Sequence, residues 1–97
     1  MADSQEYSYV LGALATAHGE NYERLPKKTK VYVLYFLGLA IDVADHGEDL
    51  RAYWDSVVWN PSDRLPFGFN FGNLEGDELE RMVRHQHTLI AAQILND

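Results

Sequence analysis

The segment Val31–Ile41 reads VYVLYFLGLAI and is the longest apolar run of the chain, with eleven residues. A helix needs about 20 apolar residues to cross a bilayer, so this run predicts a buried core helix instead. Pro26 suits the first turn of a helix and Gly47 suits a position just past its end, so we expect a helix from Pro26 to Asp45. Apolar residues on every side of it indicate a central, buried helix. The residues expected to be nearly inaccessible to solvent are Leu34, Leu37 and Ile41.

Three further segments have the apolar spacing of helices and surround this central helix in the predicted fold. They run from about Ser4 to His18, from Glu48 to Trp59 and from Glu78 to Leu95. A chain of 97 residues can bury about two-thirds of its surface, which is enough for one core. We therefore predict an all-α fold, a compact bundle of four helices in a single domain over residues 1–97, with up-down-up-down topology as the default.

The connection between the third and fourth predicted helices, 61–76, is long at sixteen residues. Within it Phe67, Phe69 and Phe71 alternate with glycine and asparagine, and in an extended segment this period of two places all three rings on one side. One interpretation is a loop that closes over the end of the bundle and buries the rings in the core. The other is an aromatic patch that meets a partner or a second copy in a homodimer. The residues of that self-association surface are Trp59, Phe67, Phe69 and Phe71.

The charge balance argues against a general nucleic-acid binder, because 15 acidic and 8 basic residues give a net charge of −7. The helix expected over 26–45 has its charges in the wrong order for its dipole, with Lys27, Lys28 and Lys30 near its start. The acidic residues at its end and in the next helix are Asp42, Asp45, Glu48, Asp49 and Asp55. Either nearby residues neutralise these charges, with Glu20 and Glu23 beside the lysines and Arg81 or Arg84 beside the aspartates, or the carboxylates form a surface that binds a basic partner protein.

The sequence carries no catalytic or metal-binding signature. Cysteine is absent, and the Gly-rich phosphate-binding and serine-nucleophile motifs are absent too. His85 and His87 are two residues apart, so on a helix they point roughly 200° from each other and cannot grip one metal ion. Asp42 and His46 share a helix face, but a metal site there would need a further ligand from another element. We expect a protein that is not an enzyme and that holds neither a metal nor a cofactor.

These exclusions favour a small acidic protein-binding module, an adaptor or inhibitor that occupies the surface of a partner protein. One alternative is a nucleic-acid mimic that blocks a DNA- or RNA-binding protein through carboxylates along one face. Another is a small enzyme or ligand carrier with a pocket between the helices expected over 4–18, 26–45 and 78–95. The lack of cysteine and of a membrane-spanning run predicts a cytoplasmic protein with no direct contact to membrane or nucleic acid.

Overall fold

The computed structural model describes residues 2–96 and contains four helices over that range. They are α1 (Ala2–His18), α2 (Lys27–Asp45), α3 (Leu50–Val58) and α4 (Gly76–Asn96). No β-strand occurs within this described part of the chain. The predicted all-α bundle of four helices is confirmed, and every helix end lies within two residues of its expected position.

Local residues at the helix ends explain these bounds. α1 ends where Gly19 adopts a φ of +92°, a left-handed backbone conformation that residues other than glycine rarely adopt. Pro26 precedes α2 with a φ of −61°, in an extended conformation. The side chain of Asp49 caps α3 by accepting a hydrogen bond from the backbone N–H of Ala52 at 3.1 Å. The capping residue lies outside the helix, so α3 begins at Leu50, two residues later than expected.

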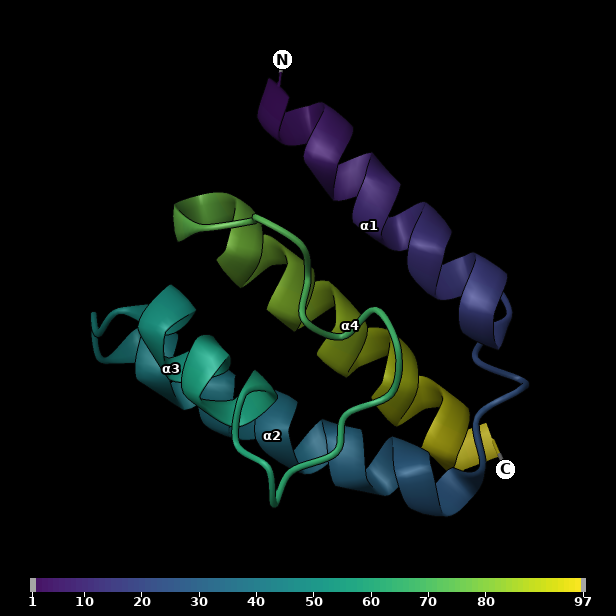
Figure 1. Ribbon diagram of the computed structural model, residues 1–97. Coiled ribbons are helices and arrows are strands. Elements are labelled where there is room, and N and C mark those ends of the chain that lie inside the picture. The colour runs from purple at the N-terminus through teal and green to yellow at the C-terminus, as the bar shows by residue number, and fades with distance from the viewer. Residues whose placement is uncertain (1, 97) are drawn as a thin grey trace.

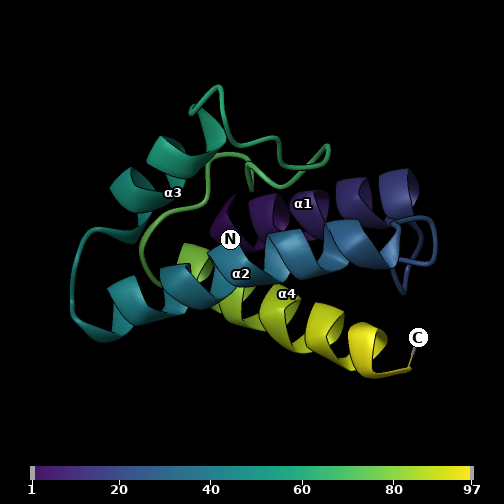
Figure 2. The same ribbon diagram turned by 90° about the horizontal axis from the view of Figure 1, so that it is seen from below.

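α4 is the helix on which the other three pack. It contacts α1, α2 and α3, whereas α2 contacts only α3 and α4 among the helices over residues 2–96. The connection from 59 to 75 lies between α1 and α3 in both views (Figure 1 and Figure 2). The loop therefore occupies the space between α1 and α3, and α1 contacts neither α2 nor α3 within the described residues.

The direction of the helices differs from the default topology. α2 runs antiparallel to α4, but α1 and α4 run in the same direction (Figure 1). In an up-down-up-down bundle the first and last helices are antiparallel, so that expectation is wrong. The long connection after α3 accounts for the difference, because it returns the chain to the end of the bundle where α1 begins before α4 starts (Figure 1).

α2 is less buried than its apolar sequence predicts. Leu37 is fully buried as expected, but Leu34 and Ile41 are half-buried, so the prediction for those two residues is wrong. The reason is that α1 does not pack on α2, which leaves one side of α2 open to solvent. The large apolar side chains exposed on that helix are Val31, Tyr35 and Leu39.

Part of the core comes from the loop and not from a helix. Phe69 and Phe71 are fully buried, together with Trp54 of α3. The indole ring of Trp54 stacks on Phe71 with ring centroids 5.3 Å apart and an interplanar angle of 13°. The indole Nε1–H donates a hydrogen bond to the backbone oxygen of Phe69 at 2.7 Å. The loop is thereby fastened to α3 through both an apolar and a polar contact.

Replacing Leu37 by alanine should lower the free energy of unfolding by about 2–5 kcal/mol, because a fully buried leucine leaves a cavity when it is truncated. Leu39 is a matched control on the same helix, since its side chain is 39% exposed. We expect Leu39→Ala to cost about 1 kcal/mol or less at low protein concentration. Urea unfolding followed by circular dichroism measures both. Equal losses for the two variants would contradict the placement of α2.

Candidate functional site

The connection between α3 and α4 is folded as a series of tight turns. The backbone N–H of Phe69 donates to the oxygen of Pro66, and that of Phe71 donates to the oxygen of Gly68, each at 3.3 Å. Gly68 and Phe71 have positive φ values of 89° and 60°. The segment is therefore not extended, and its rings do not alternate in the way a strand would require. Phe67 is 74% exposed while the next two phenylalanines are buried, so the prediction of three rings on one side is wrong.

This result corrects the predicted self-association surface. Phe69 and Phe71 are core residues, as in the first of the two interpretations, and neither is accessible to a second copy. Trp59 and Phe67 are exposed, by 78% and 74% of their surface. We call the surface formed by Trp59, Phe67 and Asn70 the loop face.

Arg51 of α3 holds the loop in place from one side. Its guanidinium donates hydrogen bonds to the backbone oxygens of Asn70 at 3.0 Å and Leu74 at 2.8 Å. The same group forms an ion pair with Asp55, one turn along α3, at 2.6 Å. Backbone carbonyls in a loop need partners when water is kept away, and a planar guanidinium with five N–H groups can supply several at once.

Residues of α1 and of the turn after it hold the opposite side of the loop. The ring of His18 donates from Nε2 to the backbone oxygen of Phe67 at 2.7 Å. His18 also packs on Phe69, with ring centroids 5.8 Å apart. Tyr22, which lies against the same phenylalanine, donates its hydroxyl to the buried Gln86 of α4. Burial raises the pKa of the Tyr22 hydroxyl, which keeps it protonated and able to donate.

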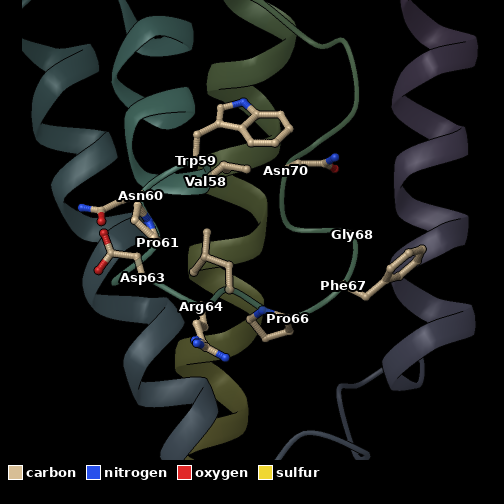
Figure 3. Close-up of a pocket in the computed structure, with 11 residues that line it drawn as sticks. Val58, Trp59, Asn60, Pro61, Asp63, Arg64, Pro66, Phe67, Gly68 and Asn70 are labelled. Atoms are coloured by element: carbon tan, nitrogen blue, oxygen red, sulfur yellow. The ribbon is translucent and has the colours of Figure 1, made fainter.

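The loop face is hollowed on both sides of Trp59. One hollow of about 530 Å³ is lined by residues between Val58 and Asn70, with Trp59 and Phe67 at its two sides (Figure 3). Phe67 points toward α1, away from Trp59 (Figure 3). A second hollow, also of about 530 Å³, adjoins the first and shares Val58, Trp59 and Asn70 with it. The other residues of the second hollow are Arg51, Asp55, Gly72, Asn73 and Glu75.

The predicted acidic surface is largely used inside the chain. Asp45 forms an ion pair with Arg84 of α4 at 2.5 Å, which is one of the neutralising contacts that the sequence left open. Asp49 caps α3, and Asp55 pairs with Arg51. Three of the five acidic residues therefore have a structural partner, and only Asp55 borders the loop face.

The two remaining acidic residues lie around His46 at the end of α2. The ring Nδ1 of His46 is 3.4 Å from a carboxylate oxygen of Asp42 and 2.8 Å from that residue's backbone oxygen. The hydrogen bond to the backbone of Asp42, that residue's negative charge and the nearby Glu48 raise the pKa of His46. All three side chains are exposed, so the cluster is solvated and not a preformed pocket.

Sequence reasoning missed the residues that shape the loop face. Arg51 is the single base between the acidic residues 42–55 and Asn70 separates two phenylalanines, but neither position predicts a role in the sequence. Exposed Tyr9 of α1 was not singled out, although it lines a third hollow of about 260 Å³ with Phe67. No local signal identifies these residues, because each acquires its role through a contact distant in sequence.

Comparisons of this chain with protein-family models, with curated proteins and with solved structures found no significant match. Within residues 2–96, no three His, Asp or Glu side chains are grouped so that they could hold a metal ion. None of the helices in the described range is both long and apolar enough to span a membrane. The interpretation of the site therefore depends on its own geometry.

Replacing Arg51 by alanine should lower the free energy of unfolding by about 2 kcal/mol, because several carbonyls of the loop and the Asp55 carboxylate lose a charged partner together. Arg24→Ala is the control, since the side chain of Arg24 donates one exposed hydrogen bond, to the backbone oxygen of Thr16, and the change should cost less than about 1 kcal/mol. Urea unfolding measures both effects. An unchanged stability in the Arg51 variant would show that the loop is held by its apolar contacts alone.

His46 should titrate above the ordinary range for histidine, with its pKa lowered again in Asp42→Asn. Because the pKa is raised in the folded state, the stability that His46 contributes is present at low pH and is lost as the pH rises through the folded-state pKa. NMR titration of the ring protons of His46 in the wild type and in Asp42→Asn measures the shift. If the pKa of His46 is the same in the wild type and in Asp42→Asn, the charge of Asp42 does not cause the raised pKa.

Proposed function

We propose that this protein is a non-enzymatic protein-binding module, and that the loop face holds a basic segment of a partner protein. The single observation that carries this proposal is Trp59, which is 78% exposed at the shared border of two hollows. Trp is the residue most often found at binding hot spots, because it buries a large ring with few rotamers to restrict.

The chemistry beside Trp59 favours a partner with arginine or lysine. Asp55 and Glu75 line the same hollow as the indole ring. Arg51 and Asp55 neutralise each other in their ion pair, so the net negative charge of this hollow comes from Glu75. A cation placed over the face of a tryptophan gains about 0.5–2 kcal/mol, and a nearby carboxylate adds to this attraction. The net charge of −7 on the whole chain attracts a basic partner from a distance.

The rigidity of the loop supports binding with little loss of conformational freedom. The segment that carries Phe67 and Asn70 is fixed by buried Phe69 and Phe71, by Arg51 and by the other contacts described above. A preorganised surface spends less of its interaction energy on ordering itself when a partner binds. We expect this binding to take place in the cytoplasm.

The alternatives drawn from the sequence have less support in the geometry. A nucleic-acid mimic needs uncommitted carboxylates along one face, whereas Asp45, Asp49 and Asp55 each have a partner within the chain. A ligand pocket between the first, second and fourth helices would need α1 near α2, and the hollow that lies between α1 and α4 has a volume of about 170 Å³. That volume is below the usual range for ligand pockets, about 300–1,000 Å³.

The proposal predicts that an arginine-containing peptide binds at Trp59. We would titrate a hexapeptide of arginine, leucine and glycine into the isotope-labelled protein and follow backbone and indole N–H signals by NMR. The shifts should centre on Trp59 and Asn70, with a dissociation constant of about 1 mM that weakens with added salt. Trp59→Ala should weaken the binding at least tenfold, by the loss of about 1.4 kcal/mol or more.

Two controls make this test specific. The same peptide with glutamine in place of arginine should bind more weakly, because it lacks the cation. Tyr35→Ala removes an aromatic ring of similar exposure from α2 and should leave peptide binding unchanged. Shifts that centre on Asp42 and Glu48 at the end of α2, with no effect of Trp59→Ala, would overturn the assignment of the loop face.

A further inference from the structure

α2 has an apolar stripe that the described chain leaves partly open to solvent. Tyr35 is 63% exposed, Val31 is 49% exposed and Leu39 is 39% exposed. Lys28 and Asp42 continue the stripe at its two ends and are exposed as well. We call these five residues the α2 stripe. Their steps along the chain are 3, 4, 4 and 3 residues, which is the spacing of one helix face.

The stripe lies on the side of α2 that faces away from the bundle. At 3.6 residues per turn its five members fall within an arc of about 80°. The buried residues Val33, Leu37 and Ala40 lie on the opposite side, where α2 packs on α4. The stripe is therefore a continuous surface about 21 Å long, with an apolar middle and one charge of each sign at its ends.

The order of residues along the stripe is symmetric about Tyr35. Val31 and Leu39 are each four residues from it, and Lys28 and Asp42 are each seven residues from it. A two-fold axis between two copies of Tyr35 would place the two α2 helices antiparallel. Val31 of one copy would then lie opposite Leu39 of the other, and Lys28 opposite Asp42. We propose that this protein forms a symmetric homodimer in which the α2 stripes of two copies pack against each other, with Lys28 of one copy paired with Asp42 of the other.

Charge complementarity selects a second copy of this chain as the occupant. Antiparallel packing places one Lys28–Asp42 ion pair at each end of the interface. A partner whose charges all have one sign could not match both ends of the stripe. Within residues 2–96 the side chain of Lys28 has no hydrogen bond or ion pair. Asp42 contacts only the exposed His46 through its carboxylate, so its outer side is open to a lysine.

The dimer also explains why α2 has its charges in the wrong order for its own dipole. In an antiparallel pair the start of one helix lies beside the end of the other. Lys28 then lies beside the negative end of the neighbouring α2, and Asp42 lies beside the positive end. Each residue that is unfavourable for its own helix becomes favourable for the helix of the second copy.

The expected affinity follows from the size of this contact. An interface centred on one helix face buries less than about 1,200 Å², the size of weak and transient complexes. We expect a dissociation constant of about 10–500 µM, measured by sedimentation equilibrium over a range of protein concentrations. The apolar middle supplies most of the attraction, and the two ion pairs set the register.

The decisive experiment uses two charge-reversal variants. In Lys28→Asp both ends of the interface become acidic, and in Asp42→Lys both ends become basic, so each variant alone should remain monomeric. Mixed together, the two variants should form a heterodimer, because every end again pairs opposite charges. We expect association in the mixture at least tenfold tighter than in either variant alone. Failure of the mixture to associate more tightly than its components would overturn the proposal.

Further variants separate this surface from the loop face. Lys27→Asp changes the net charge by the same amount as Lys28→Asp but lies beside the stripe, and it should leave the dimer intact. Tyr35→Asp should abolish the dimer without loss of helical circular dichroism, whereas Phe67→Asp should not affect it. A wild-type chain that stays monomeric at about 1 mM, or a dimer lost through Phe67→Asp and not Tyr35→Asp, would show that the α2 stripe is not the interface.

Discussion

The contact between Trp54 and the loop segment around Phe69 and Phe71 is the interaction on which the rest of the structure depends. It combines a stacked aromatic pair with a buried hydrogen bond to the backbone, so the ring and the chain position of the loop are held together. These rings fill the space between α1 and α3, because α4 is the one helix that α1 contacts within residues 2–96. The loop is thus a structural layer of the bundle and not a flexible connection.

This arrangement decides which surfaces the protein presents. Because the loop fills the core from one side, its remaining large ring, Phe67, and the neighbouring Trp59 have no room inside and lie on the surface. Because the loop and not α1 completes the bundle, α2 keeps one apolar side uncovered. The position of the loop therefore accounts for both exposed aromatic surfaces, the loop face and the α2 stripe.

The helices could be predicted from the sequence, whereas their arrangement could not. Proline and glycine act within one turn, so Pro26 and Gly47 predicted both ends of α2 to within one residue. The period-two reading of the phenylalanines failed because the turns at Gly68 and Phe71 depend on what the loop packs against. The buried status of Leu34 and Ile41 was overestimated for a similar reason. An apolar pattern on every side of a helix indicates that its burial is favourable. The number of elements packed against the helix decides how much of its surface is buried.

The candidate site divides in the same way between local and distant causes. The acidic run was visible in the sequence, but its partners were not, because Asp45 meets Arg84 across 39 residues of chain and Arg51 meets the loop from 19 to 23 residues away. The reversed charges of α2 were the one surface feature that local reasoning found and that the monomer leaves largely unexplained. Asp45 is accounted for by Arg84, yet Lys28 and Asp42 stand at the ends of an apolar stripe with two-fold symmetry in its sequence. A helix tolerates unfavourable charges at its ends when another helix supplies the opposite dipole, and α4 already does so for the buried side of α2 by running antiparallel to it. An antiparallel second copy of α2 would do the same for the exposed side, because the symmetric stripe places each Lys28 and each Asp42 beside the oppositely charged end of the other helix.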